Sequence, residues 1–93
     1  MYRFLCHRLF SAKASGAMLV CTIDGNDYKV EPYTCEIHST EFINGIVIVG
    51  GAELRRHSAQ LQTMPEDEIP AYLEKYSLLE IADGEEPVIL PLG

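Results

Sequence analysis

Three pairs of turn-forming residues divide this chain into short apolar runs, and they limit its fold more than any other feature of the sequence. They are Asp24-Gly25, Asn44-Gly45 and Asp83-Gly84. An Asp-Gly or Asn-Gly pair adopts positive φ at little cost, as the tight turns between antiparallel strands require. We therefore predict β-hairpins with turns near residues 24–27, 44–45 and 83–84.

The runs between these turns have the pattern of strands. Residues 17–23 are almost continuously apolar and residues 46–49 are β-branched throughout, which is typical of strands covered on both faces. Residues 28–31 and 33–38 alternate in polarity, which is typical of half-exposed strands. Residues 2–10 are apolar on both alternating faces; we predict a strand there, although a short helix also fits.

The second half of the chain has helical spacing. From Ala52 the apolar residues recur every three or four positions, which predicts a helix of about three turns. A second helix is predicted to begin near Asp67 or Glu68, which places Pro70 in its first turn, where proline is tolerated. Its predicted buried stripe is Ile69, Tyr72, Leu73 and Tyr76.

These elements predict an α+β fold in a single small globular domain spanning residues 1–93. We expect an antiparallel sheet of about five to six strands with one or two helices packed on one face. Pro87 and Pro91 have no N–H group to donate to a ladder, so the last strand, residues 85–90, is predicted to lie at an edge. Hydrophobic residues at 47% and charged residues at 23% fit a globular chain.

The acidic residues are concentrated in one segment. The chain has 14 acids, 7 bases and a formal net charge of −7. Residues 1–65 carry equal numbers of acids and bases, so residues 66–86, where Lys75 is the one base, supply the whole excess. The acids of this segment are Glu66, Asp67, Glu68, Glu74, Glu80, Asp83, Glu85 and Glu86.

This acidic segment favours a protein partner with a basic surface, because complementary charge speeds encounter and rejects acidic competitors. It opposes direct binding to nucleic acid and to anionic membranes. We therefore predict a non-enzymatic interaction module, regulatory or inhibitory, whose carboxylates imitate nucleic-acid phosphates in the sharpest version of the hypothesis. Tyr72 or Tyr76 would add an aromatic anchor. A purely solubilising surface is the simpler alternative.

Two other functions stay open on sequence grounds. The first is a structural or assembly protein, a homo-oligomer that associates through the edge strand near Pro87 or through residues 2–10. The second is a metal-binding or enzymatic domain built from cysteine and histidine. Its nearest cluster is Cys35, Glu36 and His38, but residues three apart in a strand point to opposite faces. We therefore expect no catalytic residue, no metal and no cofactor.

The remaining motifs are weak. Gly50-Gly51 before a helix that carries Arg55-Arg56 resembles an anion-binding turn in form, but it lacks both the G-x-G-x-x-G pattern and the P-loop lysine. We expect the two glycines to allow a sharp exit from the preceding strand.

Three cysteines without a C-x-x-C spacing indicate reduced thiols. Arg3, His7 and Arg8 interrupt any secretory apolar run, so we expect a cytoplasmic protein, with a targeting role of residues 1–16 left open.

Overall fold

The computed structural model describes residues 2–33 and 40–92. Four strands come first, and after two helical pairs the chain returns to the sheet as a fifth strand. The strands are β1 (Tyr2–Phe10), β2 (Gly16–Asp24), β3 (Asp27–Pro32), β4 (Glu41–Gly50) and β5 (Val88–Leu92). The helices are the 3-10 helix η1 (Ala52–His57), α1 (Ser58–Thr63), the 3-10 helix η2 (Glu66–Glu68) and α2 (Ile69–Lys75).

The predicted α+β class is confirmed, but the sheet is mixed and not purely antiparallel. The strand order is β3-β2-β1-β4-β5, and β5 lies at an edge, as its prolines predicted. Each neighbouring pair is antiparallel except β1 and β4, which are parallel. The difference arises because β4 does not pair with β3, the strand before it. It pairs with the remaining edge of β1, which puts β1 at the centre of the sheet.

One of the three predicted hairpins forms as expected. Asp24 faces Asp27 at the end of the β2–β3 ladder, and Gly25 in the turn has φ of 63°. The predicted strand over residues 33–38 falls almost entirely outside the described residues.

The hairpin predicted at Asn44-Gly45 is wrong, because β4 runs straight through this pair. In the ladder with β1, Cys6 faces Ile43 but Arg8 faces Ile46, so two residues of β4 stand opposite one residue of β1. This is a β-bulge, and Gly45 has φ of 104° in it. A bulge uses the same positive φ as a tight turn, so the local sequence signal is the same for both.

The hairpin predicted at residues 83–84 is also wrong, although a turn forms there. The Glu85 amide donates to the Ala82 carbonyl at 3.0 Å, and Gly84 has φ of 82°. The residues before the turn form no strand, and β5 pairs with β4 instead. The segment before the turn is held elsewhere: the Gly51 amide donates to the Leu78 carbonyl at 3.1 Å.

Gly50 and Gly51 make this attachment sterically feasible. A Cβ atom on Gly50 would lie 2.2 Å from the Leu78 carbonyl oxygen, and one on Gly51 would lie 2.2 Å from the Glu80 carbonyl oxygen. The obstructing atoms belong to the backbone, so no side-chain rotation removes the clash. The glycine pair therefore admits residues 78–80 against the end of β4.

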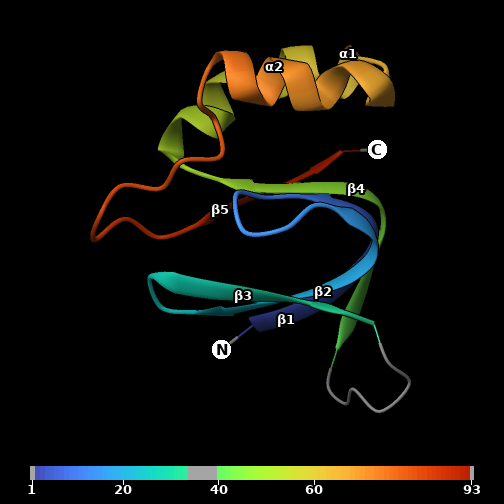
Figure 1. Cartoon of the computed structure of the whole chain (residues 1–93), viewed down its shortest axis with the longest axis vertical. Coiled ribbons are helices and arrows are strands. Elements are labelled where there is room, and N and C mark those ends of the chain that lie inside the picture. The colour runs from blue at the N-terminus through green and yellow to red at the C-terminus, as the bar shows by residue number, and fades with distance from the viewer. Residues whose placement is uncertain (1, 34–39, 93) are drawn as a thin grey trace.

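The sheet is strongly curled, and β4 has a core on each side. Figure 1 shows the helices on one side of β4 and β5, with β1, β2 and β3 curling beneath the other side. The helix-side core contains Phe10, Ile48, Leu54, Leu61, Ile69, Leu73, Leu78, Val88 and Leu92. The core inside the curl contains Phe4, Cys6, Leu9, Cys21, Tyr28, Val47 and Val49.

The helical layer agrees with the sequence prediction in its position but not in every buried residue. The first predicted helix is present as η1 followed by α1, with Leu54 and Leu61 buried. Pro70 lies in the first turn of α2 as predicted. Tyr76 was expected in the buried stripe, but it is 45% exposed because α2 ends at Lys75 and leaves it at the surface.

Replacing Gly50 with alanine tests the close approach of residues 78–80. A glycine-to-alanine change in open space usually stabilises a protein by about 0.4–1 kcal/mol through the unfolded chain. Here we expect the opposite sign, a loss of about 1–3 kcal/mol in the free energy of unfolding, because the methyl group meets the Leu78 carbonyl. Urea denaturation measures the change, and a neutral or stabilised Gly50→Ala variant would contradict this packing.

Candidate acidic surface around helix α2

The eight predicted site residues lie on η2, on α2 and in the loop that follows α2. Seven of them are exposed and Glu85 is half-buried. In Figure 1 this loop leaves the helical layer at the end of α2 opposite to η2 and runs down the side of the sheet, so the acidic segment extends beyond both ends of α2.

Two of the eight have partners within the chain. Glu66 Oε2 lies 3.2 Å from Arg8 Nε, an ion pair that joins η2 to β1. Glu85 Oε1 accepts a hydrogen bond from the Ala52 amide at 2.9 Å, which ties the loop to the start of η1. These two carboxylates support the fold.

The other six are exposed, and within residues 2–33 and 40–92 none has an ion pair or a side-chain hydrogen bond. They are Asp67, Glu68, Glu74, Glu80, Asp83 and Glu86. Carboxylates elsewhere in the described chain mostly have partners. Asp27 pairs with Lys13, Glu31 with Lys29, and Glu53 with Arg56, while Glu41 accepts from the Tyr2 hydroxyl. The unpaired negative charge of the described residues is therefore concentrated in residues 67–86.

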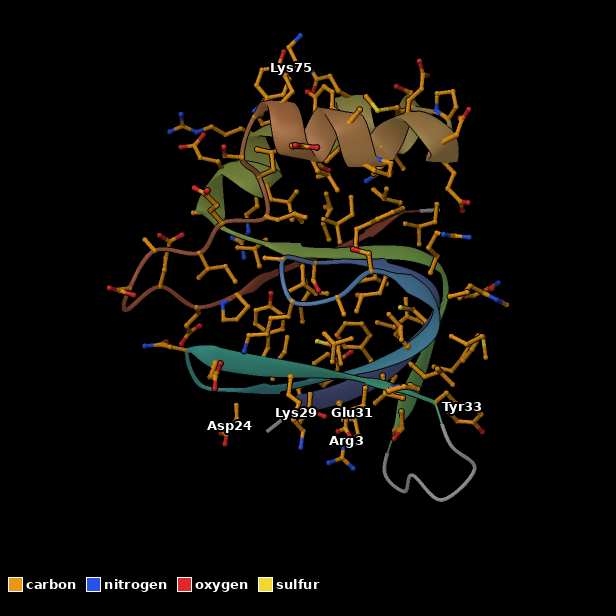
Figure 2. All side chains as sticks on the ribbon, viewed as in Figure 1. Arg3, Asp24, Lys29, Glu31, Tyr33 and Lys75 are labelled. Carbon is orange, nitrogen blue, oxygen red and sulfur yellow. The ribbon has the colours of Figure 1, made fainter. Side chains whose placement is uncertain are left out.

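The charges on the outer face of the sheet are balanced by comparison. Arg3, Lys29, Asp24 and Glu31 all point away from the curled sheet on the same side (Figure 2). At the rim of the sheet, Lys13 Nζ donates to Asp27 Oδ1 at 2.9 Å and to the Tyr28 carbonyl. The hydrogen bond from Lys13, with a further one from the Tyr28 amide, lowers the pKa of Asp27. This face shows no excess of either sign.

A groove lies between the loop of residues 11–15 on one side and α2 with the turn after it on the other. We call it the apolar groove; it has a volume of about 390 Å³. Its buried floor is formed by Phe10 and Leu73, and Glu74 and Glu80 are its exposed carboxylates. The sequence predicted the two glutamates but not the groove, because residues 11–16 read only as a polar connection.

A second hollow of about 430 Å³ adjoins the apolar groove. The two share Ser77 and Glu80, and the second also contains Glu53, Tyr76 and Glu85. Glu80 therefore lies at the junction of the two hollows. Glu53 is not among the predicted site residues, because it precedes the acidic segment in the sequence.

The turn after α2 places Ser77 between the two hollows. The Leu78 amide donates to the Leu73 carbonyl at 3.0 Å and the Ser77 amide to the Glu74 carbonyl at 3.2 Å, the bonding pattern of a Schellman C-cap. Ser77 has φ of 51°, the left-handed conformation that this cap requires and that glycine usually supplies.

Three aromatic rings lie beside the acidic residues. The ring centroids of His57, Tyr72 and Tyr76 are 4.8 to 5.5 Å apart, and His57 Nδ1 lies 2.7 Å from the Tyr72 hydroxyl. Lys75 Nζ lies 5.4 Å from the Tyr76 ring centroid, and Figure 2 shows Lys75 on the outer side of the helical layer. The Tyr76 ring is thus already in contact with one cation of this chain.

The described thiols have the properties of core residues. Cys6 and Cys21 are buried inside the curl of the sheet. Burial raises the pKa of Cys6 to about 11, and burial together with the nearby Cys6 raises the pKa of Cys21 to about 12. Both remain protonated at neutral pH and are poor nucleophiles.

The loose metal cluster of Cys35, Glu36 and His38 falls outside the described residues. Among residues 2–33 and 40–92, no three histidine, cysteine or acidic side chains come together as metal ligands.

Comparison with protein-family models, with curated proteins and with solved structures finds no match to this chain. No helix in the described part of the chain has the length and apolar character needed to cross a bilayer.

Replacing Ser77 with glycine should stabilise the protein by a few tenths to about 1 kcal/mol, because glycine adopts the left-handed conformation without the Cβ penalty. Ser77→Val should lose stability for the converse reason. Thermal and urea unfolding measure both variants. A glycine variant less stable than the parent would show that Ser77 makes a contact worth more than its backbone strain.

Cys6 and Cys21 should resist alkylation in the folded protein, because both thiols stay protonated up to high pH. In a Cys35→Ser variant at pH 8, we expect iodoacetamide to label neither thiol until urea is added, and then to label both. Because the pKa values of both thiols are raised, the folded state holds more protons than the unfolded state above pH 9. The free energy of unfolding should therefore fall as the pH rises towards 11 and 12. Labelling of the native protein at the rate of the unfolded chain would contradict the burial.

Proposed function

We propose that this protein is a small non-enzymatic interaction module, regulatory or inhibitory, that binds a basic surface of a protein partner. The surface it uses is the set of exposed carboxylates on η2, on α2 and in the following loop. The observation that carries this proposal is the six exposed acids without a partner in the described chain, set against the paired carboxylates elsewhere.

Within the described residues, the fold leaves the charge of these six carboxylates without a neutralising partner. Like charges held close together repel one another and lower the stability of the compact state. A basic partner removes this repulsion on binding and is drawn to the surface by its field. Phosphate and anionic lipid would add to the repulsion, so the proposed partner is a protein.

Tyr76 strengthens the proposal because it gives the acidic surface an aromatic contact. It is 45% exposed and lines the same hollow as Glu53, Glu80 and Glu85. Tyrosine and arginine are enriched among the residues that dominate binding energy at interfaces. An arginine or lysine of the partner can therefore meet carboxylates and the exposed part of the Tyr76 ring together.

The sharper form of this proposal is imitation of nucleic acid, in which the carboxylates occupy the phosphate-binding surface of a nucleic-acid-binding protein.

Self-association through an edge strand is the second candidate. Residues 2–10, the other contact considered for self-association, form the central strand β1, which is paired on both sides. Association through β3 or β5 is less favoured because these two edge strands are short and carry Pro32 and Pro91, features that oppose edge-to-edge pairing.

Charge-matched variants test the proposed function. Glu74→Gln with Glu80→Gln removes two acids from the acidic surface, and Asp24→Asn with Glu31→Gln removes two from the outer face of the sheet. We expect the first pair to weaken capture of a partner from host lysate by roughly 2- to 30-fold, since exposed ion pairs contribute about 0.2–1 kcal/mol each. The second pair should leave capture unchanged.

Ionic strength supplies the second arm of this experiment. Raising the salt from about 50 mM to about 500 mM shortens the screening length severalfold and should release the partner. Capture that ignores salt, or that falls equally in both pairs of variants, would refute the proposal. Light scattering of the protein alone checks the second candidate, which predicts a dimer.

A further inference from the structure

The apolar groove combines a buried apolar floor with two exposed carboxylates. Phe10 and Leu73 are buried beneath it, and Pro70 and Leu79 add further apolar surface. Its volume of about 390 Å³ falls within the range of about 300–1,000 Å³ found for ligand pockets. Acidic groups are present only as Glu74 and Glu80, and none of the residues that line the groove is basic.

Both walls of the groove are fixed before any partner binds. On one side, the Ser11–Ser15 loop is closed on itself: Ser11 N donates to Ser15 Oγ at 3.3 Å and Ala14 N donates to Ser11 Oγ at 3.1 Å. Lys13 ties the same loop to Asp27 on the β2–β3 hairpin. On the other side, the C-cap of α2 fixes the backbone at Ser77. Binding in such a groove costs little ordering of the protein.

The composition of the groove selects the chemistry of its occupant. A purely apolar group would desolvate the two carboxylates without replacing their contacts with water, which is costly. An anion would be repelled. The side chains of lysine and arginine carry an aliphatic stem and a charged head, so they match an apolar floor with acids at its edge.

We infer that the apolar groove receives a lysine or arginine side chain of the partner together with an apolar residue next to it. The aliphatic stem and the apolar residue pack over Phe10, Leu73 and Leu79, and the charged head lies between Glu74 and Glu80. This inference rests on the proposed function and names the segment of the partner that the acidic surface recognises.

The two hollows share part of their lining, so the same partner segment can contact both. Because Glu80 borders both, a second basic residue of the same segment can reach the hollow that contains Tyr76 and Glu85. There its head meets carboxylates and the exposed part of the Tyr76 ring. The recognised segment is therefore expected to contain two basic residues separated by an apolar one.

Short capped peptides test the groove directly. The probe is a tetrapeptide of alternating leucine and arginine, compared with one in which citrulline replaces arginine and one in which glycine replaces leucine. In backbone-amide NMR titrations we expect the shifts to cluster at residues 11–15 and 73–80. Both control peptides should bind at least about fivefold more weakly, because each loses one of the two matched interactions.

A filling variant separates the groove from the surface around it. Ala12→Phe adds a large side chain to the exposed loop that lines the groove, and Ala59→Phe makes the same change on α1. We expect Ala12→Phe to abolish the clustered shifts and Ala59→Phe to preserve them. Glu74→Gln with Glu80→Gln should also weaken the peptide, which gives a second variant that leaves the loop untouched.

The outcomes distinguish this inference from the function on which it rests. Peptide binding that survives Ala12→Phe, or shifts centred on Asp67 and Glu68, would overturn the groove and leave the acidic surface standing. No peptide binding at millimolar concentration would overturn the groove as well. Salt-insensitive capture of the native partner would instead overturn the proposed function, whatever the peptide does.

Discussion

Val47 and Val49 of β4 face the core inside the curled sheet, while Ile46 and Ile48, which alternate with them, face the helices. This two-sided burial is the constraint on which the other elements depend. Side chains of a strand alternate between faces, so a single short run of branched residues can support both cores. β1 and β5 pair with its two edges, and the helical layer lies over β4 and β5.

The same alternation explains which parts of the fold could be predicted from sequence. Residues 46–49 were identified as a central strand because burial on both faces leaves a continuous apolar run. Asn44-Gly45 was misread because its backbone preference is the same in a turn and in a bulge. The choice between them depends on pairing with β1, about 40 residues earlier in the sequence, and no local pattern reports that pairing. The parallel pairing of β1 and β4 was missed for the same reason.

For the candidate site, too, local features could be predicted from the sequence, whereas features that depend on contacts between distant residues could not. The excess of acids in residues 66–86 is a property of composition, so the sequence shows it directly. The apolar groove is formed by residues 10–15 and 70–80, which meet only after Phe10 and Leu73 enter a common core. Ser77 gave no signal, because glycine is the residue expected at a position with positive φ.

Gly50 and Gly51 connect the constraint on β4 to the position of the acids. They end the doubly buried strand, and their lack of side chains lets the carbonyl groups of Leu78 and Glu80 approach. The main chain at Glu80 is therefore positioned by its close approach to Gly51, the residue directly after β4. A backbone held in this way loses little conformational freedom when a partner binds. Since Glu80 borders both hollows around the end of α2, the packing that completes the helix-side core also determines where the negative charge is presented.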